Sequence, residues 1–133
     1  MATISQGDII TAPQTLTGVW ADLGLPIETL NYSFFSPYIV LDINDSKDVR
    51  IRARAVYESG GDDFIVPLQT IKKDRILLSD YFFEIDVDVD QNIIAPFEID
   101  QTFPLVQIQV MAGTVGAVPG EITSAKYVQG YRQ

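Results

Sequence analysis

The sequence predicts an all-β fold in which antiparallel strands form a sandwich or a barrel. Apolar and polar residues alternate with a period of two in three segments, residues 49–55, 83–90 and 106–112. Such alternation is typical of strands with one buried face, which occur mainly in antiparallel sheets. Strand-like segments recur at a spacing of roughly ten residues, with turn-forming residues between them. No segment has the apolar spacing of a helix long enough to bury a face.

Further strands are expected in residues 15–23, 30–42, 63–68, 75–78, 93–99 and 121–130. The first of these surrounds the single tryptophan, Trp20, which we expect in the core. Pro37 lies within the second segment, where it predicts a bend, an edge position or a division into two strands, because proline cannot donate a hydrogen bond to a sheet. Turns are expected where Asn, Asp, Ser, Lys and Gly gather, in residues 44–46, 59–62, 72–74, 90–92 and 113–120.

The chain of 133 residues has the length of one domain with a buried core. We expect residues 13–133 to form a single β-sandwich domain. Residues 1–12 carry few core-type side chains and are expected to form an N-terminal arm that orders against a neighbour. The N-terminus lacks the basic segment and apolar run of a secretory signal, and no apolar run has the length of a transmembrane helix.

The composition excludes several classes of activity. Histidine and cysteine are both absent, which excludes disulfides, Cys–His zinc sites, thiol nucleophiles and Ser–His–Asp triads. Nine Lys and Arg residues against eighteen Asp and Glu residues give a net charge of −9, which disfavours a nucleic-acid partner. We therefore expect a protein that is not an enzyme, and we assign no catalytic, cofactor-binding or metal-binding residues.

Two charged stripes follow the period of their strands. The cationic stripe consists of Arg50, Arg52 and Arg54, and the acidic stripe of Glu84, Asp86, Asp88 and Asp90. A calcium loop that began at Asp86 would need Gly where Gln91 stands and Glu where Phe97 stands. We favour a structural interpretation in which the two strands are neighbours and the stripes face each other, because opposite charges across strands contribute roughly 0.2–1 kcal/mol per pair. A solvated face or a subunit contact is the alternative.

Other polar and aromatic clusters also have two interpretations. Residues 42–48 are either a cation-binding loop or a polar turn between strands, and we favour the turn. Residues 59–63 predict a hairpin turn, because they lack the Lys-Ser/Thr pair and the helix of a phosphate loop. Five aromatic residues either fill the core, which we favour, or form a platform for sugars: Trp20, Tyr32, Phe34, Phe35 and Tyr38.

The segment Val106-Gln-Ile-Gln-Val-Met-Ala-Gly-Thr-Val-Gly-Ala117, followed by Ile122-Thr-Ser-Ala125, resembles the C-terminal end of small virion structural proteins of tailed bacteriophages. Residues 19–24 and 42–52 are similar to a Trp-containing first strand and to an Asn-Asp-Ser turn before an Arg-bearing strand in such proteins. The resemblance extends from about Thr15 to Gly130 and rests on short structural motifs. It implies a β-sandwich of jelly-roll type and a place on the phage particle, and it implies no catalytic residue.

We therefore expect an antiparallel, jelly-roll-like β-sandwich of about eight strands in a non-enzymatic structural protein of a bacteriophage virion. We favour a capsid decoration protein that binds the major capsid protein or other virion proteins as a homo-oligomer, preferably a trimer. It would be made in the host cytoplasm, would need no cofactor, and would bind neither nucleic acid nor membrane. The alternatives are a tail or baseplate component and a carbohydrate-binding jelly-roll module with a cation held by Asp42, Asp45 or Asp48.

Overall fold

The computed structural model consists of β-strands and connecting loops. It describes residues 4–29, 32–59, 62–67, 71–72, 75–76, 83–84, 88–98 and 104–130, with the backbone alone for residues 57–59, 62–67, 71–72, 75–76, 83–84 and 98. Within these ranges there is no helix, and hence none that could span a membrane. The strands are β1 (Ile4–Asp8), β2 (Gln14–Thr15), β3 (Ala21–Asp22), β4 (Ile27–Glu28), β5 (Phe34–Asp42), β6 (Lys47–Ser59), β7 (Asp62–Pro67), β8 (Ile71–Lys72), β9 (Arg75–Ile76), β10 (Phe83–Glu84), β11 (Gln91–Ile94), β12 (Phe97–Glu98), β13 (Leu105–Thr114) and β14 (Glu121–Gly130).

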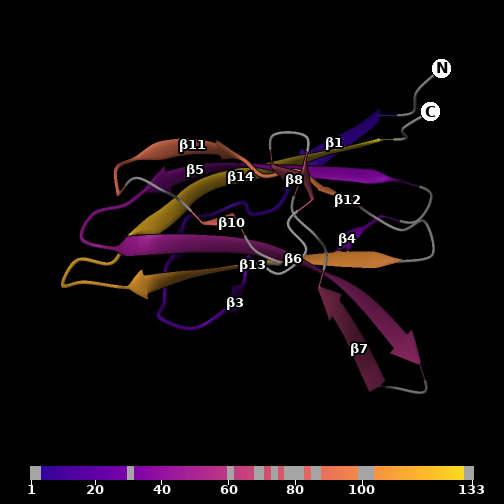
Figure 1. Ribbon diagram of the computed structural model, residues 1–133, viewed down its shortest axis with the longest axis horizontal. Helices are drawn as coiled ribbons and strands as arrows, with labels where there is room; N and C mark the ends of the chain where they lie inside the picture. Colours follow the sequence, from indigo (N-terminus) through magenta and orange to yellow (C-terminus); the bar gives the residue numbers. More distant parts are fainter. Residues whose placement is uncertain are drawn as a thin grey trace.

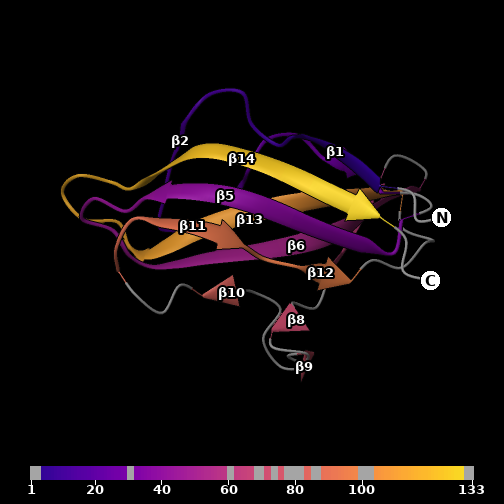
Figure 2. The ribbon, with the colours of Figure 1, turned by 90° about the horizontal axis from the view of Figure 1, so that it is seen from above.

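Two antiparallel sheets pack face to face (Figures 1 and 2). Sheet A contains β14 and β5 at its centre, with β1 and β2 beside β14 and with β11 and β12 beside β5. Sheet B contains β13 and β6 at its centre, with β3 and β4 beside β13 and with β7 and β10 beside β6. The short strands β8 and β9 pair only with each other among the described residues.

The strand order is that of a jelly roll. Where two short strands pair with the same edge of one partner, we count them as one position. These are β1 with β2, β3 with β4, β7 with β10 and β11 with β12, so the described part of sheets A and B has eight positions. Numbered along the chain, these positions run 1-8-3-6 in sheet A and 2-7-4-5 in sheet B. Such an order arises from two Greek keys, and it defines the eight-stranded jelly roll. The predicted fold class is confirmed.

The core lies between the inner faces of the two sheets. The alternation predicted for residues 49–55 and 106–112 is confirmed at its apolar positions, which are buried: Val49, Ile51, Ala53, Ala55, Val106, Ile108, Val110 and Ala112. Gln107, which the alternation places on the outer face, is buried as well. Each buried aliphatic or aromatic side chain of this size stabilises the fold by roughly 1.5–3 kcal/mol. The largest fully buried side chains are Phe35, Phe97, Leu16, Leu23, Ile39, Leu41, Ile51, Ile108, Ile122, Val49, Val106 and Val110.

The segment expected as one strand over residues 83–90 differs from the prediction. Only Phe83–Glu84 forms a strand, β10, while residues 85–87 lie outside the described part and residues 88–90 form a bend. The turn expected at residues 90–92 is wrong as well, because β11 begins at Gln91. The physical reason is that the carboxylates of Asp88 and Asp90 accept hydrogen bonds from the backbone of a neighbouring turn, as described below.

The strand expected over residues 15–23 is two short strands, β2 and β3, with Trp20 between them. Trp20 is half-buried and lies against Arg52, which is on the outer face of sheet B. The prediction that Trp20 belongs to the core is therefore wrong. Its indole ring covers a charged side chain instead of filling the space between the sheets.

Pro37 lies inside β5, which has partners on both sides and is not divided. The Pro37 carbonyl accepts a hydrogen bond from the Ala95 backbone N–H at 3.3 Å. In an antiparallel strand, the backbone nitrogen and carbonyl of one residue point to the same edge of the strand. The edge of β5 at which Pro37 lacks an N–H donor therefore faces the interruption between β11 and β12. The proline is tolerated in a central strand because the neighbouring strand is broken opposite it.

The N-terminal residues belong to the sandwich. Ile4–Asp8 pairs with β14 from Ile4↔Gly130 to Asp8↔Lys126, and Ile9 is buried in the core. This differs from the expectation of an arm separate from the domain over residues 1–12, of which residues 1–3 lie outside the described part. The expected hairpin around residues 59–63 is present as the β6–β7 pairing, which extends to Ser59↔Asp62 and projects away from the sandwich in Figure 1.

Two connections between the sheets are tied together at one end of the molecule, which we call the closed end. One is the β5–β6 turn, residues 43–46, and the other is the β13–β14 loop, residues 115–120. Asp45 N donates to the Val118 carbonyl at 3.0 Å, and Val118 N donates to Asp45 Oδ2 at 3.0 Å. The Ser46 hydroxyl donates to the Val115 carbonyl at 2.7 Å and accepts from Gly120 N at 2.8 Å.

A glycine permits this close approach of the two connections. Gly116 has a φ of 82°, a conformation that L side chains rarely adopt. A Cβ at this position would also lie 2.5 Å from the Asp45 carbonyl oxygen. The glycine-containing connection predicted for residues 113–120 is confirmed for residues 115–120, whereas residues 113–114 belong to β13. Residues 116–118 are exposed and Gly120 is buried.

Removing the Ser46 hydroxyl tests the closed end. Ser46→Ala leaves the buried Gly120 N–H and the Val115 carbonyl without this partner, so we expect a loss of about 2 kcal/mol in the free energy of unfolding. Urea denaturation measures the loss, with an unchanged dependence on denaturant. The control is Ser124→Ala on β14, for which we expect a change below about 0.5 kcal/mol. Equal effects of the two substitutions would contradict the role given to Ser46.

Candidate functional site

Three acidic side chains at the closed end accept hydrogen bonds from the backbone. Asp88 Oδ1 accepts a hydrogen bond from Asp48 N at 3.2 Å, and Asp90 Oδ1 accepts one from Ile43 N at 2.9 Å. With Asp45, these carboxylates fix the polar turn that was predicted for residues 42–48. Within the part of the chain that the structure describes, no group of three or more acidic side chains has the arrangement of a metal site. The geometry therefore favours the turn over the cation-binding loop.

The two charged stripes are only partly opposed. Strand β10 pairs with β6, and Glu84 stands opposite Arg50 in the register, so the prediction that the strands are neighbours is confirmed for this pair. Asp86 lies outside the described residues. Asp88 and Asp90 bind the turn at the closed end, so the prediction that they face the arginines is wrong.

The middle arginine of the stripe belongs to a polar chain on the outer face of sheet B. Arg52 Cζ lies 4.1 Å from the centre of the Trp20 ring, and Arg52 Nε donates to Gln109 Oε1 at 2.8 Å. Gln109 Nε2 in turn donates to Asp22 Oδ1 at 2.9 Å. Burial lowers the pKa of Arg52 from its usual value, and the positive charge of Arg54 lowers that pKa further. The arginine stays charged at neutral pH because the usual value is far above 7.

The aromatic residues do not form one platform. Phe35 is fully buried in the core, as we expected, whereas Tyr38 is 41% exposed on the outer face of sheet A. Trp20 lies on the outer face of sheet B, with one of its ring faces covered by Arg52. Trp20 and Tyr38 are therefore on opposite sides of the sandwich and cannot stack on the same sugar.

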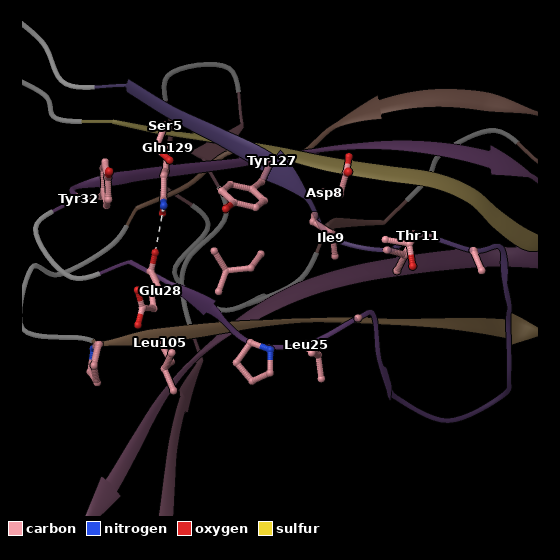
Figure 3. A pocket seen from close by; sticks show the side chains of 16 residues that line it. Ser5, Asp8, Ile9, Thr11, Leu25, Glu28, Tyr32, Leu105, Tyr127 and Gln129 are labelled. Atoms are coloured by element: carbon pink, nitrogen blue, oxygen red, sulfur yellow. Dashed lines mark hydrogen bonds between the residues drawn. The ribbon is translucent and has the colours of Figure 1, made fainter.

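A cavity lies between the edges of the two sheets, toward the end of the molecule opposite the closed end (Figure 3). We call this end of the molecule the open end. The volume of the cavity is about 1180 Å³. Sheet A contributes β1 and the last part of β14, and sheet B contributes β4 and the first residue of β13. The apolar part of the wall includes Ile9, Leu25, Ile27 and Leu105.

Gln129 connects the two sheets across this cavity. Its side chain is 3% exposed, and its Nε2 donates to the Glu28 carbonyl at 3.0 Å, shown as the dashed line in Figure 3. The Oε1 atom of Gln129 is buried and has no hydrogen-bond partner among the described residues. An unsatisfied buried acceptor of this kind costs about 1–3 kcal/mol. The side chain therefore retains an unused acceptor in the cavity wall.

The neighbouring Tyr127 is held in place from two sides. Its ring stacks on Phe35, with the ring centres 5.7 Å apart and the planes 24° apart. On the other side it lies against Gly7 of β1, where an added Cβ would be 2.7 Å from the Tyr127 hydroxyl. This close packing fixes the phenol as part of the cavity wall.

The charged side chains in the described part of the cavity wall are acidic. Asp8 and Glu28 are exposed and line the cavity, and the described lining residues include no Lys or Arg. Sequence reasoning missed this site because β14 contains a bulge between Ile122 and Ser124. The bulge shifts the alternation by one residue, so Ala125, Tyr127 and Gln129 follow Ile122 on the inner face. A glutamine at a position that simple alternation places outside carries no signal of a site.

The chain matches no protein-family model and no curated protein sequence. Its candidate sites are therefore defined by its own geometry. The hydrogen bonds of the closed end and the contact between Arg52 and Trp20 stabilise the fold. The cavity at the open end differs, because its wall includes Gln129, whose Oε1 has no hydrogen-bond partner among the described residues.

Replacing Arg52 tests the polar chain on sheet B. In Arg52→Ala the Trp20 ring loses its cation and Gln109 loses a donor, so we expect a loss of about 1–2 kcal/mol in the free energy of unfolding. The fluorescence of the single tryptophan should also move to longer wavelength, because the ring becomes more exposed. Arg54→Ala, on the same strand and face, should leave the emission unchanged. Unchanged emission in Arg52→Ala would contradict the contact.

Replacing Asp90 tests the role of the acidic residues. Asp90→Ala leaves Ile43 N without its acceptor, and we expect a loss of about 1–3 kcal/mol in thermal or chemical unfolding. Asp90→Asn keeps an acceptor oxygen and should recover most of this stability. The control Asp42→Ala removes a nearby carboxylate and should change stability by less than about 0.5 kcal/mol. A gain in stability for Asp90→Ala would indicate that repulsion among the carboxylates outweighs the hydrogen bond.

Proposed function

We propose that the protein is a non-enzymatic structural component of a bacteriophage virion, and more specifically a decoration protein that binds the lattice of the major capsid protein. The observation that carries this proposal is the strand order 1-8-3-6 and 2-7-4-5, because this jelly roll is the fold of viral capsid and lectin domains. The resemblance of residues 106–117 and 122–125 to small phage virion proteins supports the same role.

The residues favour a structural role over the other roles that the fold can have. One fold hosts many functions, so the choice between them depends on the site. Imidazole is a preferred ligand of the transition metals that enzymes use, and this chain has no histidine. A carbohydrate-binding module needs an accessible aromatic platform, but Trp20 and Tyr38 lie on opposite faces of the sandwich.

The outer face of sheet A has features of a protein-binding surface. Tyr38, Val40 and Ile94 are 41%, 40% and 57% exposed, and Ile94 stands opposite Tyr38 in the β5–β11 register. Neighbouring exposed apolar side chains of this kind are typical of interaction surfaces. A stable interface of standard size buries about 1,200–2,000 Å² in total, more than these three side chains supply, so the contact would include further surface.

The mechanism needs no chemistry. A protein that binds the assembled lattice and not its free subunits stabilises the assembly by mass action. A symmetric homo-oligomer can contact several lattice subunits at once, and a trimer is the form that we favour. The protein would be made in the host cytoplasm and would reside on the virion.

Fractionation of particles tests the proposal. Particles are purified by density gradient from a lysate of cells that carry the gene, and their heads and tails are separated. We expect quantitative mass spectrometry to find this chain in the head fraction, in a number comparable to that of the most abundant head protein. Light scattering of the purified protein should give the mass of three chains.

Three results would count against the decoration role. Presence in the tail fraction alone would assign the protein to the tail or baseplate. Its absence from all particles would overturn the virion proposal. A monomer in solution would contradict the trimer.

A further inference from the structure

The cavity at the open end is not required by the function proposed above, and it has the dimensions of a site for part of a macromolecule. Its volume of about 1180 Å³ exceeds the roughly 300–1,000 Å³ of typical small-molecule pockets. Figure 3 shows that its wall is divided between the two sheets, with Tyr127 and Gln129 on one side and Glu28 and Leu105 on the other. A space between two sheet edges can accept side chains from a strand placed alongside them.

The polar groups of the cavity wall favour a ligand group that is positively charged and donates hydrogen bonds. Asp8 and Glu28 provide two carboxylates, and no Lys or Arg is present in the described lining. Gln129 adds a buried Oε1 acceptor that no group of the described residues uses. Lysine ammonium and arginine guanidinium groups carry only donors, so they complement a wall of acceptors. The aliphatic stems of the same side chains suit the apolar contacts with Ile27 and Leu105.

Strand β1 provides a place for the backbone of such a partner. Among the described residues it pairs with β14 alone, so its second edge has no strand beside it. Backbone N–H and C=O groups on a free edge can pair with an added strand, a common mode of peptide recognition. Ser5 and Asp8 belong to β1 and line the cavity. Alternate side chains of an added strand would therefore point toward the cavity.

We infer that the open end is a receptor for an extended, lysine- or arginine-bearing segment of a partner protein, which adds a strand to β1 and inserts alternate side chains into the cavity. This inference rests on the proposed function only in that the partner is a protein. Charge complementarity favours a different protein over a second copy of this chain, because the chain has a net charge of −9. Asp8 and Glu28 bind the cationic groups, and Gln129 accepts a hydrogen bond within the cavity.

Fluorescence anisotropy with a defined peptide tests the inference. The probe is a fluorescein-labelled heptapeptide of alternating lysine and leucine, measured at low salt, where charge attraction is least screened. We expect it to bind the purified protein and to bind the double variant Asp8→Asn, Glu28→Gln at least tenfold more weakly. A heptapeptide of alternating glutamate and leucine should not bind.

A matched control separates the site from the overall negative charge. The double variant Asp42→Asn, Glu121→Gln removes the same charge from the paired β5 and β14 positions at the closed end, and it should change affinity less than twofold. Amide resonances of Gly7, Ile27 and Gln129 should shift on peptide addition, while those of Gly116 and Gly120 should not. These measurements use the isolated protein, so their outcome does not depend on the outcome of the particle fractionation.

Four results would overturn the inference. They are equal weakening in both double variants, equal binding of the acidic peptide, no binding of the lysine peptide, and resonance shifts confined to the closed end. A homo-oligomer that the lysine peptide dissociates would assign the cavity to a second copy and overturn the choice of a different protein as partner.

Discussion

The hydrogen bonds between the β5–β6 turn and the β13–β14 loop are the interaction on which the rest of the sandwich depends. Both connections carry the chain from one sheet to the other, and Ser46 and Asp45 bind the loop through both donors and acceptors. This link fixes how β5 and β14 of sheet A lie over β6 and β13 of sheet B. The apolar faces of these four central strands can then pack in one arrangement. At the open end the sheets are linked through Gln129, and space remains between them.

The composition explains why polar residues hold the closed end. A chain without cysteine and histidine cannot use a disulfide or a Cys–His zinc site to join two loops. Here aspartates accept hydrogen bonds from backbone N–H groups, and Gly116 allows the backbones to approach. Three acidic residues of the closed end, Asp45, Asp88 and Asp90, are thus occupied by the fold. Those that line the cavity at the open end, Asp8 and Glu28, are exposed.

The sequence predicted those features that depend on local alternation. The buried faces of β6 and β13 follow from their period of two, because a strand with one buried face repeats every second residue. Features that depend on distant partners were not predictable. Asp88 and Asp90 continue the alternation but bind a turn that lies 40 and 47 residues earlier in the chain. Trp20 has the hydrophobicity of a core residue but covers Arg52, and a bulge in β14 turns Gln129 toward the cavity.

The closed end holds the fold together, while the second edge of β1 at the open end has no strand beside it among the described residues. Native-state hydrogen exchange followed by NMR tests it most directly, because it measures the opening free energy of each amide. The Ile43 and Gly120 amides, which donate to Asp90 and Ser46, should exchange only through global unfolding. Those of β1 should exchange through local opening at a lower free energy. Exchange at Ile43 and Gly120 that is faster than exchange in β1 would contradict the account.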